Sequence, residues 1–282
     1  AMGRYGGREC SYASDADVIA LHEAVGGATE AEAAASATAI VNRVKNLLGS
    51  ATNQLGIVVD LDLRPEGKNG PMSRTIESHR EYAQRWASTW ERQAAVRARP
   101  IGEGSLADSA RALFDELAYG GVSETDVRDI RLLKARMENE RLPRGIEPAR
   151  HVKLGPGGLT DVEWTIQLIQ MRAGMNNPAL RTPSTTQAIL SARENALISA
   201  QDAQTLLEAW DMATRIRAAN TLASGRMSGV KLDVLPRDSA DLRALAAILG
   251  YGSGGLNALE DDWLRAGRKA RAVMERLFWE QQ

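Results

Sequence analysis

Hydrophobic positions follow two different spacings along this chain. Up to about residue 104 they mix the alternation that is typical of strands with the three-and-four spacing of helices. Nearly everything after Gly104 has helical spacing with few strand signals. We therefore predict an α+β fold with two domains, a mixed domain over residues 1–104 and an α-helical bundle over residues 105–282.

The mixed part predicts two strands and two long helices. The first helix carries an apolar stripe that includes Ile40, Val44 and Leu47, and the second places Trp86 and Trp90 on one face because they are four residues apart. Glycines and prolines mark a loop after the second strand. We predict strands at 15–21 and 57–63, helices at 29–48 and 76–97, and a loop at 64–71.

The second part predicts seven helices separated by breaks that contain glycine, proline or asparagine. Pro143, Pro148 and the glycine cluster at 155–158 interrupt the pattern between the second and third of them. The predicted helices lie near 106–119, 123–140, 159–173, 184–198, 201–224, 238–250 and 256–279.

Composition narrows the class of protein. The chain has 282 residues, of which 44% are hydrophobic but only two are Phe, so Ala, Leu, Ile and Val must build a core that leans helical. Its 35 Lys and Arg nearly balance 36 Asp and Glu, which argues against nucleic acid as the main partner. Because Met2 leads directly into a glycine motif, we expect the chain to be a fragment of a longer polypeptide.

Cysteine and histidine usage fits a reducing cytoplasm. The single cysteine excludes an intramolecular disulfide, and the three scattered histidines lack the spacing of zinc ligands. No apolar run approaches the roughly 20 residues that span a bilayer. We expect a cytoplasmic protein with no membrane partner.

The strongest chemical signal is a pair of carboxylates behind a pair of glycines. Asp15 and Asp17 stand two apart at the start of an apolar run, so on a strand they share a face and could share a divalent cation. Gly6 and Gly7 would let the backbone approach a phosphate. Asp60 in the second strand supplies a third acid if the two strands pair.

Simpler explanations compete with this metal-phosphate site. An Asp-x-Asp sequence occurs by chance in many loops, and Ser14 with Asp15 could form a turn or a cap. Asp62 competes with Asp60, since both lie on one face of the predicted second strand. Four cations could hold a triphosphate, although solvated surface positions are the commoner role for each: Arg64, Lys68, Arg97 and Arg99.

Several blocks together resemble the bacterial glutamine synthetase adenylyltransferase/deadenylylase family. They begin with Gly-Gly-Arg-Glu at 6–9, Tyr-Ala-Ser-Asp-Ala-Asp at 12–17 and Val-Asp-Leu-Asp-Leu-Arg-Pro at 59–65. Further blocks lie at 89–99 and 153–163. The resemblance covers residues 6 to about 172. It implies a DNA polymerase β-like nucleotidyltransferase domain, a small mixed sheet with flanking helices, followed by the helical bundle.

The resemblance also assigns roles to residues. It makes Asp15, Asp17 and Asp60 the catalytic acids and the ligands of two Mg²⁺ ions, with ATP as substrate and Asp60 as the candidate base for the acceptor. At position 62, where a basic residue is often found in the family, this chain has Asp62. The nucleotide-binding set is then Gly6, Gly7, Arg8, Ser14, Arg64 and Lys68.

Family proteins have two similar halves, one attaching AMP to a tyrosine of glutamine synthetase and one removing it by phosphorolysis. Residues 89–93 and 160–161 look more like the C-terminal, adenylylating half, whereas 64–71 looks closer to the deadenylylating half. We expect the adenylylating half. The implied partners are glutamine synthetase, a PII-type signal protein and the other half of the full-length enzyme.

Three other functions compete with adenylylation or its reversal. A uridylyltransferase for a PII-type protein would consume UTP, and an RNA-directed enzyme is disfavoured by the charge balance. A nucleotide-sensing binding module without chemistry would have no need for three clustered acids. In the later block, Asp161 and Glu163 lie in the first turn of a helix, where acids complement the helix dipole.

Overall fold

The computed structural model describes residues 1–12, 14–49, 56–252 and 254–280, so Ala13 of the 12–17 block lies outside the described residues. The chain divides into two compact units. We call residues 1–10, 14–122 and 171–184 the sheet unit, and residues 11–13, 123–170 and 185–282 the helical unit. The domain boundary predicted at residue 104 stays a prediction.

The sheet unit contains two short parallel strand pairs in its described residues. β1 (Ala16–Asp17) pairs with β3 (Val59–Asp60), and β2 (Ala20–Leu21) pairs with β4 (Ser73–Arg74). The strand predicted at 15–21 is therefore interrupted, because its two ends pair with different strands. Both pairs are parallel, so the small sheet is confirmed but its mixed character is not.

Two strand predictions need correction. The strand predicted at 57–63 is shorter than expected. Its pairing with β1 ends at Asp60, and Asp62 lies in the turn that follows. β4 was not predicted, because it is two residues long and leads through Thr75 directly into a helix. Thr75 caps that helix by accepting a hydrogen bond from the Ser78 backbone at 3.2 Å.

The long helix predicted at 76–97 is in fact two helices, α3 (Ile76–Trp86) and α4 (Thr89–Ala95). Ala87 between them is extended, and Ser88 starts α4 with a capping box in which the Glu91 carboxylate accepts from the Ser88 backbone at 2.8 Å. Trp86 and Trp90 therefore belong to different helices, and the prediction that they share one helical face was wrong.

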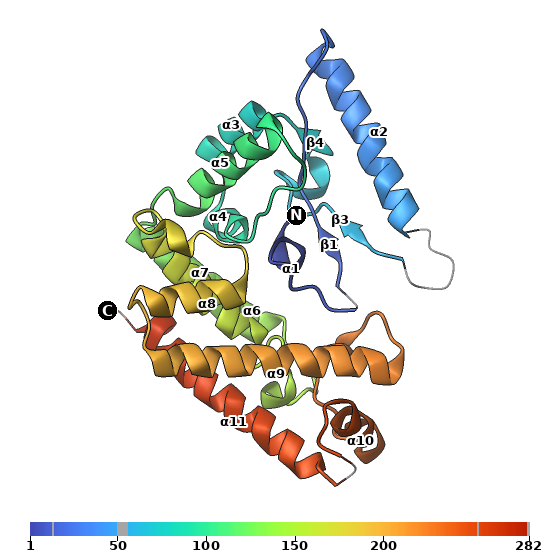
Figure 1. Cartoon of the computed structure of the whole chain (residues 1–282), viewed down its shortest axis with the longest axis vertical. Helices are drawn as coiled ribbons and strands as arrows, with labels where there is room; N and C mark the ends of the chain where they lie inside the picture. Colours follow the sequence, from blue (N-terminus) through green and yellow to red (C-terminus); the bar gives the residue numbers. More distant parts are fainter. Residues whose placement is uncertain (13, 50–55, 253, 281–282) are drawn as a thin grey trace. The chain divides into compact units, whose positions relative to one another are not determined.

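The other helices of the sheet unit are α1 (Gly3–Gly6), α2 (Glu30–Gly49) and α5 (Ser105–Tyr119). The sequence did not predict α1, which is one turn long. The apolar stripe of α2 does not enter a core: Ile40 is 63% exposed, and no residue of α2 is buried. In Figure 1, α2 runs beside the strands as a single outer helix.

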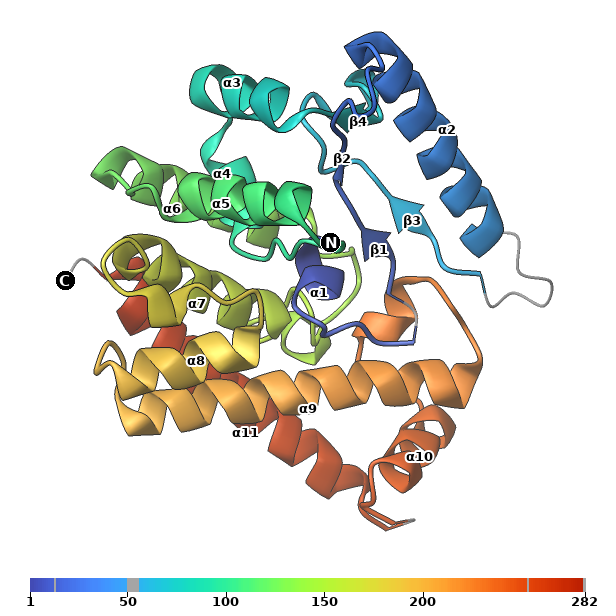
Figure 2. The same ribbon diagram turned by 45° about the horizontal axis from the view of Figure 1, so that its top comes forward.

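The helical unit is built around α9 (Ala200–Ser224). Figures 1 and 2 show α8 (Thr185–Glu194) lying along it and α11 (Leu256–Met274) crossing it obliquely, and α9 contacts both. Leu206 and Ile216 on α9 and Trp263 on α11 are fully buried in the core of this unit. The remaining longer helices are α6 (Glu124–Glu140), α7 (Leu159–Ala173) and α10 (Ser239–Ile248).

All seven helices predicted after Gly104 are present, and their ends agree with the prediction to within five residues. Short helical turns lie at Pro148–Arg150, Val230–Asp233 and Glu275–Trp279 in the helical unit, and at Gly67–Asn69 and Pro178–Leu180 in the sheet unit. Searching the described helices finds none with the length and apolarity needed to cross a membrane.

Candidate functional site

The β1–β3 pair places two of the predicted acids side by side. Asp17 is the register partner of Asp60, and the ladder is extended by hydrogen bonds from Ala16 N to Val58 O and from Val18 N to Asp60 O, both 2.8 Å. Side chains at paired positions of neighbouring strands project from the same face of a sheet. The two carboxylates therefore lie on one face, as the sequence predicted.

Asp15 stands just ahead of β1 and is exposed. One residue, Ala16, separates it from Asp17, and this spacing would direct it to the same face if the strand continued through Asp15. Among the described residues, however, no group of three or more His, Cys, Asp or Glu lies close enough together to hold a metal ion. The structure thus brings together Asp17 and Asp60, and the participation of Asp15 stays a prediction.

Asp62 is directed away from that pair. Its carboxylate lies 3.4 Å from the Lys68 ammonium and 3.9 Å from the Arg64 guanidinium, while its backbone N–H donates to Asp60 Oδ1 at 2.6 Å. The prediction that Asp60 and Asp62 share a strand face was wrong, because the ladder ends at Asp60. The Asp62 carboxylate therefore faces the loop cations, whereas Asp60 stays in the ladder beside Asp17.

The two loop cations predicted to bind nucleotide have different surroundings. The Arg64 side chain is 10% exposed and donates to the carbonyls of Leu61 at 2.9 Å and Gly70 at 3.2 Å, so it holds the loop closed. Lys68 is 81% exposed. Lys68 is therefore the loop cation that can swing toward an anionic ligand without breaking the loop.

The glycine pair ends α1, and its amides are engaged within that turn. Gly6 N donates to Met2 O at 2.7 Å and Gly7 N donates to Gly3 O at 3.1 Å. A Cβ on Gly6 would lie 1.8 Å from the Arg97 carbonyl oxygen. Close backbone packing is thus one reason for glycine here, and the cradling of phosphate by Gly6 and Gly7 stays a prediction.

Gly3 is a site residue that the sequence analysis missed. Its φ is +52°, and a Cβ there would lie 2.6 Å from Asp17 Oδ2. The Met2 backbone N–H donates to Asp17 O at 2.8 Å, which fixes the start of α1 against β1. The signal was a third glycine three residues before the Gly6-Gly7 pair, which the positive φ and the close approach to Asp17 together explain.

Arg97 and Arg99 support the glycine segment from its other side. Arg97 is 4% exposed, and its guanidinium lies 2.5 Å from the Glu9 carboxylate. Arg99 donates to the carbonyls of Gly6 at 2.8 Å and Tyr5 at 2.9 Å, at the C-terminal end of α1. Neither arginine is a merely solvated surface cation, since both hold backbone or a buried acid.

The other two predicted nucleotide-binding residues lie at the edges of this segment. Arg8 follows the glycine pair, is exposed, and has a φ of 58°. Ser14 directly precedes Asp15 and is half-buried. Their contact with nucleotide stays a prediction.

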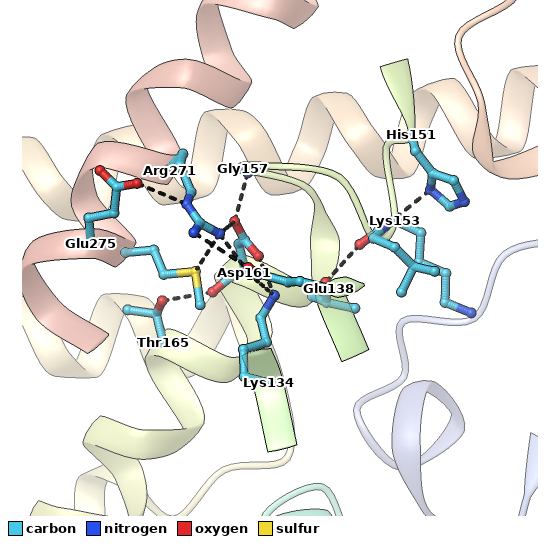
Figure 3. Close-up of polar contacts among 12 residues, drawn as sticks. Lys134, Glu138, His151, Lys153, Gly157, Asp161, Thr165, Arg271 and Glu275 are labelled. Carbon is cyan, nitrogen blue, oxygen red and sulfur yellow. Dashed lines mark hydrogen bonds and ion pairs between the residues drawn. The ribbon is translucent and has the colours of Figure 1, made fainter. Parts of the chain in front are cut away.

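The 153–163 block forms a different structure, a buried ion-pair network in the helical unit (Figure 3). Asp161 on α7 and Lys134 on α6 are each 1% exposed, and Lys134 Nζ lies 2.5 Å from Asp161 Oδ1. The other Asp161 oxygen accepts from Gly157 N at 2.8 Å and from Arg271 on α11 at 3.2 Å. Asp161 therefore joins three helices, a role that the helix-dipole explanation did not contain.

Glu138 completes the network between the two cations. It lies 2.8 Å from Lys134 Nζ and 2.7 Å from Arg271 Nη1. Burial alone would raise the pKa of Glu138, but hydrogen bonds from Arg271 and Lys134 outweigh it and hold the pKa below its ordinary value. The four charges compensate one another, as buried charges must.

Comparison with known proteins agrees with the sequence blocks. A family model described as glutamate-ammonia ligase adenylyltransferase matches residues 1–113, and one described as GlnD PII-uridylyltransferase matches residues 131–278. Over 281 residues the chain is 46% identical to the bifunctional glutamine synthetase adenylyltransferase/adenylyl-removing enzyme of Streptomyces coelicolor. The chain belongs to this adenylyltransferase/adenylyl-removing family.

Other members of the adenylyltransferase/adenylyl-removing family are similarly close. The chain is 46% identical to the protein of Bifidobacterium longum subsp. infantis over 286 residues and 40% identical to that of Mycobacterium marinum over 280 residues. The matches cover 98–100% of the chain, yet only 28%, 26% and 28% of the Streptomyces, Bifidobacterium and Mycobacterium proteins. The chain thus spans little more than a quarter of these relatives.

Proposed function

We propose that this chain transfers the adenylyl group of ATP to a tyrosine of glutamine synthetase and releases pyrophosphate. The observation that carries the proposal is the register of β1 and β3, which sets Asp17 beside Asp60 on one face of the sheet. Two adjacent carboxylates repel each other unless a cation lies between them. A face built in this way suits a metal-bound triphosphate.

Mg²⁺ fits this donor set, because hard divalent cations prefer carboxylate oxygens. Asp15, Asp17 and Asp60 would hold it, with Asp15 moving in from its exposed position. When bound, the metal would neutralise charge on the phosphates of the transferring nucleotide. The nearness of Gly3 to Asp17 keeps side-chain atoms away from that carboxylate.

The acceptor must lose a proton as its oxygen attacks the α-phosphorus. Asp60 is the candidate base, since Oδ1 already accepts the Asp62 N–H and Oδ2 is left for the tyrosine hydroxyl. Lys68 would follow the departing pyrophosphate, since its one ion pair among the described residues is the exposed pair with Asp62. Arg97 and Arg99 would keep the glycine segment in place during transfer.

The proposal commits to the adenylylating half of the family. The residues at 89–93 and 160–161 support this choice because they resemble the adenylylating half. The alternative is the opposite activity, phosphorolysis of adenylyl-tyrosine to ADP. The proposed partners are glutamine synthetase, the other half of the full-length enzyme and a PII-type signal protein.

Uridylyl transfer is the second candidate function. The match of residues 131–278 to a PII-uridylyltransferase model favours it. The acids, however, lie in residues 1–113, where the matching model describes an adenylyltransferase. Nucleotide preference separates the two, since uridylyl transfer would consume UTP.

The test is incubation of the chain with glutamine synthetase and Mg-ATP labelled at the α-phosphate. We expect label on the synthetase, and none with the Asp15→Asn, Asp17→Asn double variant. Release of ADP from AMP-modified synthetase in phosphate, without any label transfer, would instead identify the deadenylylating half. If both assays and a parallel UTP assay with a PII-type acceptor fail, the chain is a binding module and the proposal is wrong.

A further inference from the structure

The sheet unit contains a cavity of about 170 Å³ that the proposed transfer reaction does not use. It is lined by three arginines, Arg99, Arg111 and Arg181, and by Tyr119. Of its lining residues in the described chain, Asp115 is the one acid. The cavity is far larger than the roughly 10–15 Å³ that one water needs, so it has room for a polyatomic ligand.

The arginines have donors left over after their protein contacts. Arg99 uses Nε and Nη2 on the carbonyls of Gly6 and Tyr5, and Arg181 uses the same two atoms on the carbonyls of Gly174 at 2.9 Å and Met175 at 3.0 Å. Nη1 of each remains. Arg111 is exposed and makes no hydrogen bond or ion pair with a described residue. Backbone contacts thus fix two guanidinium groups without consuming all their N–H groups.

Tyr119 supplies an independent sign of a ligand. Its side chain is buried, with 4% exposure, it lines the cavity, and its hydroxyl has no hydrogen-bond partner among the described residues. The Arg181 guanidinium lies 5.8 Å from the centre of its ring. The hydroxyl oxygen itself is not among the fully buried atoms that lack a partner, so it is accessible, and Tyr119 lines the cavity. An acceptor atom bound there could take the hydrogen bond that no described residue accepts.

We propose that this cavity binds a small oxyanion, a phosphate or carboxylate group, held by Arg99, Arg111 and Arg181 and by the Tyr119 hydroxyl. Three guanidinium groups against one carboxylate leave a net charge of about +2, which matches a dianion. Burial first, and then Asp115, raise the pKa of Tyr119, so its hydroxyl stays protonated and donates. Arg111 and Arg181 also interact electrostatically with Asp115, so they would attract the ligand and this acid at the same time.

Binding here would reach the glycine segment through Arg99. The same guanidinium that offers Nη1 to the cavity already holds the Tyr5 and Gly6 carbonyls. An anion on Nη1 would restrict the remaining motion of that side chain. We therefore expect an occupied cavity to slow amide exchange in residues 5–8, whether or not the chain transfers adenylyl groups.

The experiment is titration of the full chain with inorganic phosphate by calorimetry, with EDTA present, no nucleotide, and constant ionic strength. Malonate in a second titration asks whether a carboxylate ligand also binds. We expect saturable binding of at least one of them, weakened at least fivefold by both Arg111→Ala and Tyr119→Phe. Tyr119→Phe removes only the hydroxyl, so it tests the contact without emptying the core.

Arg85→Ala is the matched control, because Arg85 is an exposed arginine on α3 of the same unit. It should bind as the unchanged chain does, and so should the Asp15→Asn, Asp17→Asn double variant. Saturation by phosphate alone or by malonate alone supports the proposal and shows whether the cavity prefers a phosphate or a carboxylate. No saturable binding, equal weakening in Arg85→Ala, or loss of binding in the double variant would overturn it.

Discussion

The Lys134 ammonium lies 2.5 Å from the Asp161 carboxylate, and both side chains are 1% exposed. This pair connects α6 to the first turn of α7, and Arg271 extends it to α11. Because the charges are withdrawn from water, each depends on the other for compensation. The packing of three helices is therefore tied to one ion pair.

Lys134→Ala should destabilise the protein by about 3–5 kcal/mol, the usual cost of leaving a buried charge without its partner. Urea unfolding followed by circular dichroism measures this. The matched control is Lys269→Ala, an exposed lysine on α11, which should change stability by less than about 0.5 kcal/mol. Equal effects of the two substitutions on the free energy of unfolding would show that the ion-pair network does not stabilise the protein.

Asp60→Asn should lower adenylyl transfer by about 10²–10⁴-fold, the usual contribution of a positioned base. Asp62→Asn is the control two residues away, where the half-exposed acid pairs with the exposed Lys68 at 3.4 Å and with the largely buried Arg64 only at 3.9 Å. Exposed pairs contribute about 0–1 kcal/mol, so a loss of about fivefold at most is expected there. Initial rates of label transfer decide the question, and a larger loss in Asp62→Asn would reverse the assignment of the third acid.

Gly3→Ala should impair transfer more than Gly26→Ala. Both glycines have positive φ, +52° and +64°, so both substitutions strain the backbone. Only at position 3 would the new Cβ meet a neighbour, Asp17 Oδ2, because nothing lies within 4 Å of position 26. We expect Gly3→Ala to reduce transfer at least tenfold more than Gly26→Ala, with comparable thermal midpoints. Comparable rates would mean that Asp17 can move aside.

Stability should fall as the pH drops below about 6.5, in part because of His79. Burial, with a smaller contribution from Arg74, lowers the pKa of His79 to about 4 from an ordinary value of 6.5. The unfolded chain therefore binds more protons than the folded chain between these values, and stability is lost as the pH falls from 6.5 toward 4. Burial also lowers the pKa of His151, which acts in the same direction.

Urea unfolding at pH 7.5, 6.0 and 5.0 tests this effect. His79→Gln removes the titrating group, so the loss of stability between pH 7.5 and pH 5.0 should be smaller in the variant, by up to about 2 kcal/mol. Identical pH profiles for the two proteins would show that His79 is accessible to protons in the folded state.

Most helices could be predicted because their start signals are local. Ser123, Ser199 and Asp238 each accept a backbone hydrogen bond at a predicted helix start, and the apolar spacing after them is uninterrupted. The break at Ala87 was also encoded, by Ser88 and Glu91, but the helix-forming residues on both sides concealed it. Local signals were thus enough to predict the helices, except at Ala87, where a capping signal competed with the helix-forming residues around it.

The site was harder to predict because its geometry is set by distant segments. Asp17 and Asp60 could be proposed from their types and spacing, but their register required the fold. Nothing near Arg97 or Arg99 in the sequence indicates that they hold Glu9, Tyr5 and Gly6, about ninety residues earlier. The contact of Gly3 with Asp17 is likewise invisible until α1 lies against β1.

Close backbone packing in the helical unit limits how this protein can evolve. A Cβ at Gly157 would lie 1.8 Å from the carbonyl oxygen of Gly267, and the φ of Gly157 is +71°. The obstacle is backbone, so no exchange of a side chain on α11 can make room for one at position 157. A substitution at position 157 therefore has no simple side-chain suppressor, because only a shift of the α11 backbone itself could relieve the overlap.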